Sequence, residues 1–474
     1  MDEPQRPDEL SEDAWLATPL EVRQFLALLM MKLAAIEARL NQNSQNSSKP
    51  PSSDPPSAPP RPAKTPRGKP KTKGAQPGHP DQQRDLIPTS EVSQVVPLRP
   101  TTCHACQHAL PEDLAPIGPP RRQQVWDMPL APPEVTEYQY QTVICPCCQA
   151  WVAAQRPDDV PPGAFGPRLV ALIALLHGRY RISNRELVDL LRMVWQIPIS
   201  VGSVSELQQV ASAALAPAQA EVQAVIAAAD HVHVDETRWR EGTRRPWLWV
   251  AVGTLATLFM IQLGRGKTQL DALLDASFTG FVTSDRLTTY NRLPLTRRQV
   301  CWAHLIRNLR SRVETKGRWQ ADAADLLALA ELVFAVWDRY RTGAIDRETL
   351  RAMLEPIQHA MWERLHVAER GGQYLGSLCR EMIRLWDALW TFVKVDGIEP
   401  TNNAAERALR PAVLWRKGCY GTQSDGGSRF VERILTVSAT CEQHERPLFP
   451  YLIAAVTAYW ANQPAPQLLP TGGA

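Results

Sequence analysis

The sequence has 474 residues, with 52 Lys and Arg against 49 Asp and Glu. At roughly 150 residues per domain this length predicts about three domains, and an apolar content of 44% excludes a disordered chain. Acidic residues are concentrated in residues 1–40 and basic residues in residues 49–84, which indicates a polyanionic partner. The polar, acidic N-terminus shows no export leader, so we expect a cytoplasmic protein whose nine cysteines are metal ligands or free thiols.

The first predicted element is a helix over residues 15–42, in which apolar side chains recur at spacings of three and four residues. This heptad pattern predicts a short coiled coil between two chains, and a single amphipathic helix packed on another domain is the alternative. Residues 43–90 are rich in Asn, Ser and Pro and predict a disordered basic linker. Its bases predict contacts with DNA phosphates, whereas the alternative is a merely solubilising spacer. The bases concerned are Lys64, Arg67, Lys69, Lys71 and Lys73.

Residues 95–155 contain two pairs of cysteines at a spacing that is typical of zinc ligands. Cys103 and Cys106 form the first pair, and Cys145 and Cys148 form the second. Two such pairs supply the four thiolates of a closed, tetrahedral structural Zn²⁺ site, so we expect zinc here, with Cys147 outside the site. The alternative is buried free cysteines, which is our interpretation of the four isolated cysteines later in the chain.

Residues 164–216 predict three helices joined by short turns. Ser183 with Glu186, and Ser203 with Glu206, have the spacing of a capping box, which marks the start of a helix. The three helices are compatible with a helix-turn-helix that places its third helix in the major groove of DNA. A plain helical bundle fits the same pattern equally well.

Residues 230–310 predict five strands. The uncharged stretch 247–263 is interrupted by Gly253 and Thr254, so we interpret it as a buried hairpin and not as a membrane-spanning helix. The segment that follows the strands, and the chain from Asn402 onward, show apolar positions at helical spacing.

Three carboxylates have positions that suit metal-dependent phosphoryl transfer. Asp235 and Asp285 each end a predicted strand, and Glu406 lies at the start of a predicted helix. Brought together, they would hold two Mg²⁺ ions across a phosphodiester. His304 and Arg307, just past the last strand, are candidate partners of phosphate or of the carboxylates. The alternatives are turn-forming aspartates, an ordinary helix pair between Glu406 and Arg410, and a solvated helix face that carries Arg307.

As an ordered set, these motifs resemble the large transposase of the insertion sequence 66 family of bacterial mobile elements. The resemblance covers nearly the whole chain. The motifs that carry it are residues 46–54 (Asn-Ser-Ser-Lys-Pro-Pro-Ser-Ser-Asp), 74–80 (Gly-Ala-Gln-Pro-Gly-His-Pro), the two cysteine pairs, 234–237 (Val-Asp-Glu-Thr), 247–250 (Trp-Leu-Trp-Val), Ser284-Asp285 with Tyr290, 301–305 (Cys-Trp-Ala-His-Leu) with Arg307, and 402–411 (Asn-Asn-Ala-Ala-Glu-Arg-Ala-Leu-Arg-Pro).

The resemblance implies a multidomain α+β protein with an RNase H-like catalytic core over residues 228–430. The helical segment 315–396 would be an insertion in this core, and residues 431–474 would be a C-terminal helical segment. The implied metal-binding triad is Asp235, Asp285 and Glu406. The residues expected around it are His304, Arg307, Asn403 and Arg410.

Our leading hypothesis is a DDE-type transposase that cleaves and joins DNA strands at the terminal inverted repeats of an insertion sequence. We expect double-stranded DNA as its partner, a homo-multimer associated with the bacterial nucleoid, accessory proteins encoded by the same element, and no membrane. Two alternatives are a DNA-binding regulator with a degenerate nuclease fold and an RNase H-like nuclease that cuts without joining. The complete set of three acids favours the transposase.

Overall fold

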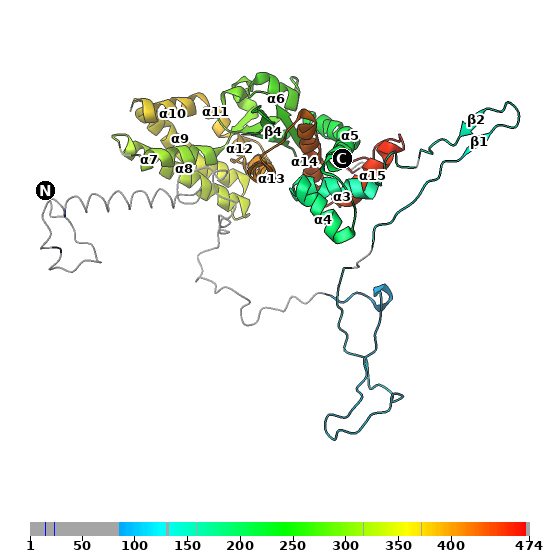
Figure 1. Ribbon diagram of the computed structural model, residues 1–474. Helices are drawn as coiled ribbons and strands as arrows, with labels where there is room; N and C mark the ends of the chain where they lie inside the picture. The colour runs from blue at the N-terminus through cyan, green and yellow to red at the C-terminus, as the bar shows by residue number, and fades with distance from the viewer. Residues whose placement is uncertain are drawn as a thin grey trace. The chain divides into compact units, whose positions relative to one another are not determined.

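The computed structural model describes residues 85–128, 132–158, 160–315, 317–370 and 372–470, together with Trp15 and Arg23 (Figure 1). The predicted coiled-coil helix over 15–42 and the linker through residue 84, with the five bases predicted to contact DNA, lie outside these ranges apart from those two residues. The chain divides into two compact units, one of residues Pro60–Glu134 and one that contains Val135–Ala474.

The described part of the unit Pro60–Glu134 has little regular structure. It contains one short 3₁₀ helix, η2 (Thr89–Glu91), and an isolated bridge between Thr102 and Ala109. Its hydrogen bonds include one from the backbone N–H of Ile87 to Gln124 Oε1 (3.0 Å). None of its described residues is buried, so this part of the chain has no apolar core of its own.

The second unit begins with an exposed antiparallel hairpin of strands β1 (Thr142–Ile144) and β2 (Trp151–Ala153). Its centre is a five-stranded sheet in the order β5-β4-β3-β6-β7. Strands β3 (His231–Arg238), β4 (Trp247–Val252) and β5 (Thr257–Gln262) pair antiparallel, whereas β6 (Phe281–Ser284) and β7 (Arg298–Val300) run parallel to β3. All five predicted strands are therefore present, and the stretch 247–263 is the predicted hairpin.

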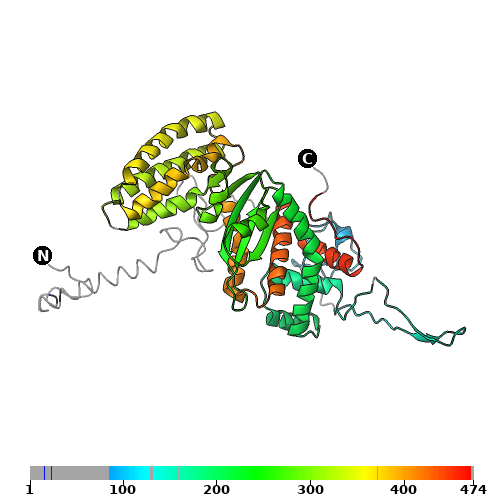
Figure 2. The same cartoon turned by 90° about the horizontal axis from the view of Figure 1, so that it is seen from above.

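Helices form the larger core together with the antiparallel half of the sheet, some of them in contact with its strands and the others packed on those helices (Figure 2). They are α3 (Pro167–Gly178), α5 (Val201–Ala227), α6 (Lys267–Leu274), α13 (Asn403–Cys419), α14 (Asp425–Gln443) and α15 (Leu448–Trp460). Helix α14 begins before the domain boundary expected at residue 430 and crosses it, because its buried face packs against β5 and α5. Residues 425–460 thus belong to the core of the sheet.

The helices predicted over 164–216 are α3, α4 (Asn184–Trp195) and the first part of α5. They enclose a small apolar core of Ile173, Leu187, Leu191 and Val204. Helix α5 continues to Ala227, beyond the expected boundary, and its second half packs against α14 and β5. By length and composition this helix alone in the described chain could span a membrane, but its contacts are those of a core helix.

One of the two predicted capping boxes is confirmed. Ser183 and Glu186 cap each other at the start of α4, with Ser183 Oγ accepting from the Glu186 N–H at 3.3 Å. The box predicted at Ser203 is wrong. Helix α5 begins at Val201, and Ser200 Oγ accepts from the Ser203 N–H (3.0 Å), so Ser203 is the capped residue and not the capping one.

A second core belongs to the helices that follow β7. Helix α7 (Trp302–Glu314) packs on α8 (Gln320–Arg341), which packs on α9 (Arg347–Ala368). Helix α10 (Gln373–Arg384) and the short helices α11 (Trp386–Leu389) and α12 (Thr391–Lys394) complete the predicted helical segment, drawn in yellow beside the sheet in Figure 2. Thr391 Oγ1 donates to the carbonyl of Arg298 (2.6 Å), which ties this segment to β7.

Side chains of α14 pair with the free edge of the sheet. The backbone N–H groups of Thr257 and Phe259 on β5 donate to Thr440 Oγ1 (3.2 Å) and Thr436 Oγ1 (2.9 Å), and that of Ile261 donates to Glu432. Four residues of a helix advance about 6 Å and two residues of a strand about 6.7 Å, so the two repeats match over this length. Helix α14 thus satisfies the donors of an edge strand that otherwise would invite another strand.

Candidate active site

Alternation along β3 separates two sets of side chains. His231, His233 and Asp235 share one face, whereas Val232, Val234 and Glu236 point to the other and are buried. Strands β3 and β6 are paired in parallel, with His233 opposite Thr283. Asp235 and Asp285 each lie two residues beyond this pair, so the two predicted aspartates leave neighbouring strands at the same level.

The charge of Glu406 acts on the pKa of Asp235, which indicates that the third acid lies nearby. Burial and three nearby carboxylates raise the pKa of Asp235 well above its usual range, and those carboxylates belong to Glu236, Asp285 and Glu406. Asp235 Oδ1 accepts from the backbone N–H of Glu236 (2.9 Å), and Asp285 Oδ1 accepts from that of Leu287 (2.8 Å). The mutual repulsion of these acids is what a bound divalent cation would relieve, so the donor set fits Mg²⁺.

Glu406 lies in the first turn of α13 and faces α7. Its Oε1 lies 3.7 Å from His304 Nδ1 and 3.5 Å from a terminal nitrogen of Arg307. Both Glu406 Oε1 and His304 Nδ1 are buried atoms without a hydrogen bond in the described chain. Burial and the charge of Arg307 lower the pKa of His304, so this imidazole is neutral at pH 7 and offers a lone pair.

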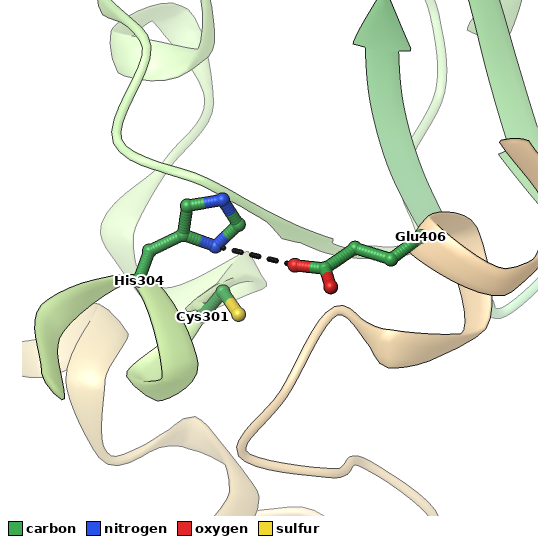
Figure 3. Close-up of side chains that lie close together, drawn as sticks. All are labelled: Cys301, His304 and Glu406. Carbon is green, nitrogen blue, oxygen red and sulfur yellow. Dashed lines mark ion pairs between the residues drawn. The ribbon is translucent and has the colours of Figure 1, made fainter. Parts of the chain in front are cut away.

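Figure 3 shows Cys301, His304 and Glu406 pointing toward one another from the start of α7 and the start of α13. One ligand atom of each lies within 4.8 Å of the other two. Cys301 is fully buried, which raises the pKa of its thiol to about 12, and its Sγ accepts from the Asn402 N–H (3.2 Å). The thiol is therefore neutral here and serves as a hydrogen-bond acceptor at the N-terminus of α13.

Asn402, which the sequence did not single out, holds α13 to the sheet. This residue is fully buried, and its Nδ2 donates to the carbonyl of Val234 at 2.7 Å. Its Oδ1 lies 3.3 Å from His233 Nδ1. The predicted neighbour Asn403 is half-buried, and the described chain offers its side chain no hydrogen bond. Asn402 therefore links the strand that carries Asp235 to the helix that carries Glu406.

Glu236 belongs to a second buried network on the far face of β3. Its Oε1 accepts from Arg265 Nε (2.8 Å), and its Oε2 accepts from the hydroxyl of Tyr290 (2.6 Å). Tyr290 follows Asp285 in the 3₁₀ helix η3 (Thr288–Arg292). The only signal in the sequence is an acid at a position where the alternation of β3 requires a buried side chain.

Two arginines support the loop of Asp285. A terminal nitrogen of Arg298, which is fully buried, donates to the carbonyl of Asp285 at 2.8 Å. Arg286 pairs with Glu381 of α10 and donates to Asn308 Oδ1 (3.1 Å). Arg286 thus points toward the helical segment and not toward the acids. Arg410, predicted near the triad, is exposed.

The two cysteine pairs have the same local structure, each within its own unit. The N–H of Cys103 donates to the carbonyl of His108, and the N–H of Cys145 donates to that of Ala150, both at 2.8 Å. In each turn the fourth residue after the first cysteine is a Gln with a positive φ, 60° for Gln107 and 58° for Gln149.

Hydrogen bonds to sulfur also recur in both turns. Backbone N–H groups and the second cysteine of each pair lower the pKa of Cys103 and of Cys145. All four predicted zinc ligands are exposed or half-buried, so they are not the buried thiols of the alternative interpretation. Cys301, Cys379 and Cys441, in contrast, are buried.

Comparisons with known proteins identify the family of the chain. The model of the transposase IS66 family matches residues 162–429, and a family of unknown function (DUF6444) matches residues 7–85. The uncharacterized protein y4qI of Sinorhizobium fredii (strain NBRC 101917 / NGR234) is 25% identical over 250 residues, which are 48% of this chain and 46% of that protein. This chain thus spans about half the length of that relative.

The uncharacterized protein y4hP of the same strain is 24% identical over 418 residues, which are 80% of this chain and 74% of that protein. The IS66 model covers more than half of the chain, including the sheet, the helical segment and all three predicted acids. The chain therefore belongs to the IS66 family of transposases.

Proposed function

We propose that this protein is a DDE-type DNA transposase that cleaves and joins strands at the terminal inverted repeats of a bacterial insertion sequence. The observation that carries the proposal is the cluster of Asp235, Asp285 and Glu406, three acids from β3, the end of β6 and α13 whose charges act on one another. In a member of a transposase family, such a cluster is the expected site of phosphodiester chemistry.

The sheet supports an RNase H-like core. Three antiparallel strands, two further strands parallel to the first, and the order β5-β4-β3-β6-β7 agree with that fold. The first acid then lies on the central strand, the second after the adjacent parallel strand, and the third on a helix packed against β3. The helical segment after β7 would be the insertion that separates the second acid from the third.

The three acids would hold two Mg²⁺ ions, which supply activation of the attacking oxygen and stabilisation of the leaving oxygen. Asp235 and Asp285 would hold the ions from neighbouring strands, and Glu406 would hold them from the helix. The charge of Arg307, 3.5 Å from Glu406 Oε1, attracts this carboxylate, and His304 lies 3.7 Å from the same oxygen. Asn402 fixes the helix from which Glu406 projects.

We further propose that Cys103, Cys106, Cys145 and Cys148 bind one structural Zn²⁺. The identical turns support this proposal, since N–H groups directed at sulfur stabilise thiolates before the metal binds. The DNA partner, the association of several copies and the need for accessory proteins are proposals that rest on the family.

The experiment that tests the function is movement of a marker flanked by the DNA that borders this gene, in cells that carry the neighbouring genes. Asp235→Asn, Asp285→Asn and Glu406→Gln should each abolish movement, whereas Glu348→Gln, at an exposed acid of α9, should not. Movement at the wild-type rate in any of the three variants would remove that acid from the site. Cut but unjoined DNA would instead favour the nuclease.

A further inference from the structure

Exposed bases gather on two elements that lead away from the three acids. On α13 these are Arg407, Arg410 and Lys417, and we refer to them as the helix bases. The end of β3 and its connection to β4 carry the hairpin bases, which are Arg238, Arg240, Arg244 and Arg245. Both sets begin within a few residues of an acid, since β3 carries Asp235 and α13 carries Glu406. We call the two sets together the basic track.

The helix bases lie on one side of α13. Their spacings of three and seven residues place them within a narrow sector of the helix surface, and Glu406 lies at the edge of the same sector. At about 1.5 Å per residue, the stretch from Glu406 to Lys417 is about 16 Å long. This stretch of α13 is as long as about four or five successive phosphates of one strand of a duplex.

Hydrogen bonds and a close backbone contact with the loop before α14 hold the hairpin that carries the other bases. Its Glu241 is buried and accepts from Ser428 Oγ (2.6 Å), while the N–H of Thr422 donates to the carbonyl of Arg240 (2.8 Å). Gly421 has a φ of +89°, and a Cβ at that position would collide with the carbonyl oxygen of Arg240. The backbone is therefore fixed against the loop before α14, whereas the arginine side chains are exposed.

The two elements are in direct contact. Arg416 of α13 donates to Thr237 Oγ1 (3.1 Å) and to the carbonyl of Arg238, so the helix is joined to the end of β3. Helix α13 also packs along β3 and β4. The helix bases and the hairpin bases consequently lie on neighbouring elements beside the acid cluster.

Few carboxylates pair with the arginines of the basic track. Arg244 lies 3.6 Å from Glu241, and in the described chain no other carboxylate comes within ion-pair distance of the six arginines. Arg240 and Arg245 donate to carbonyl groups of their own hairpin, which orients their guanidinium groups without cancelling the charge. An excess of positive charge on a preorganised backbone is suited to a regularly spaced polyanion.

We propose that the basic track binds the sugar–phosphate backbone of the duplex DNA that runs out of the acid cluster, and fixes its path without reading its bases. This inference rests on the proposed function, because it assigns the acids to the same DNA. Arginine and lysine contacts to phosphate give affinity and register, and they carry no sequence information directly.

The test is binding of the full-length protein to a short fluorescent duplex, measured by anisotropy over a range of salt concentrations without added Mg²⁺. One duplex carries the DNA that borders the gene, and a second of equal length has an unrelated sequence. The hairpin variant is Arg240→Gln, Arg244→Gln and Arg245→Gln. The helix variant is Arg407→Gln, Arg410→Gln and Lys417→Gln. In the matched control, Arg339, Arg341 and Arg370, three exposed arginines of the helical segment, are each replaced by Gln.

Each track variant should weaken binding of both duplexes by about tenfold or more, and reduce the slope of log affinity against log salt by about two to three. The control should leave the slope within about one of the wild-type value. An unchanged slope, an equal loss in the control, or a loss limited to the bordering sequence would overturn the inference. Because no chemistry occurs in this assay, Glu406→Gln should bind normally, which separates failure of the track from failure of the proposed function.

Discussion

Asp235 and Glu236 are neighbours on β3, but their surroundings differ because successive side chains of a strand point to opposite faces of the sheet. Glu236 ties together Arg265 and Tyr290, whereas Asp235 accepts one backbone N–H and faces other acids. A folded pKa above the unfolded value means that ionisation of Asp235 lowers stability as the pH rises through that pKa. The proposed metal binding at Asp235 would therefore oppose the stability of the metal-free fold.

Substitutions at Asp235 and at Glu236 should therefore shift the thermal midpoint in opposite directions. In metal-free buffer at pH 8, Asp235→Asn should raise the thermal midpoint, because a neutral side chain removes the repulsion and keeps the acceptor. The gain should shrink as the pH falls toward 4. Glu236→Ala should lower the midpoint instead, since it leaves the buried hydroxyl of Tyr290 unpaired at about 1–3 kcal/mol and also removes the partner of the half-buried Arg265. Thermal melts of both variants check this, and a destabilised Asp235→Asn would contradict it.

Asn402 and Asn403 offer a matched pair. Asn402→Ala should lower the thermal midpoint and reduce transposition by about a hundredfold or more, because it unties α13, and with it Glu406, from the carbonyl of Val234. Asn403→Ala should change both by much less. Melts and the marker-movement assay measure the two effects. Equal losses in the two variants would show that the bonds of Asn402 are not the cause.

At the scale of elements, the strands and the first capping box follow from local pattern. The hairpin 247–263 and the cap at Ser183 each depend on residues close in sequence. Contacts of long range could not be predicted in this way. Asn402 meets Val234 across 168 residues, and Thr440 meets Thr257 across 183. The pattern of a single sequence contains no information on which distant polar groups meet. The order of the three acids along the chain could therefore be read from the sequence, whereas the residues that hold them in place could not.

One of the α14 side chains that pair with the edge of the sheet, Glu432, has a shifted pKa. Burial raises the pKa of Glu432 to about 7, above its ordinary 4.5. This group thus favours the folded state most below pH 4.5, and the contribution is lost as the pH rises through 7. A tenfold change in proton affinity is worth about 1.4 kcal/mol, so full ionisation costs up to about 3 kcal/mol.

Glu432→Gln should therefore remove part of the loss of stability between pH 5 and pH 8, because Gln keeps the acceptor for the N–H of Ile261 without gaining a charge. The difference in thermal midpoint between wild type and variant, followed over this pH range, measures the effect. Glu442→Gln, at an exposed position of the same helix, is the control and should leave the pH dependence unchanged. A constant difference at all pH values would contradict the titration.

At the scale of the whole molecule, burial divides the chain into parts of different kinds. The sheet and its helices have two large apolar cores. Residues 95–155 have none among those described, and Trp126 and Trp151 are 60% and 80% exposed. A segment of this size without a core depends on a metal or on disulfides for stable structure. The lowered thiol pKa values at Cys103 and Cys145 favour the metal.

The purified protein should accordingly contain one zinc per chain. A strong chelator should make the cysteines of residues 95–155 reactive toward an alkylating reagent and the segment sensitive to protease, while the helical circular dichroism of the cores stays nearly unchanged. Cys103→Ser and Cys148→Ser should each lose the zinc, because three thiolates hold it far less tightly than four. Cys147→Ser, beside a ligand but outside the site, should keep it. Full zinc content in Cys148→Ser together with loss in Cys147→Ser would exchange the roles of these two cysteines, and full content in all three variants would show that the two turns do not share an ion.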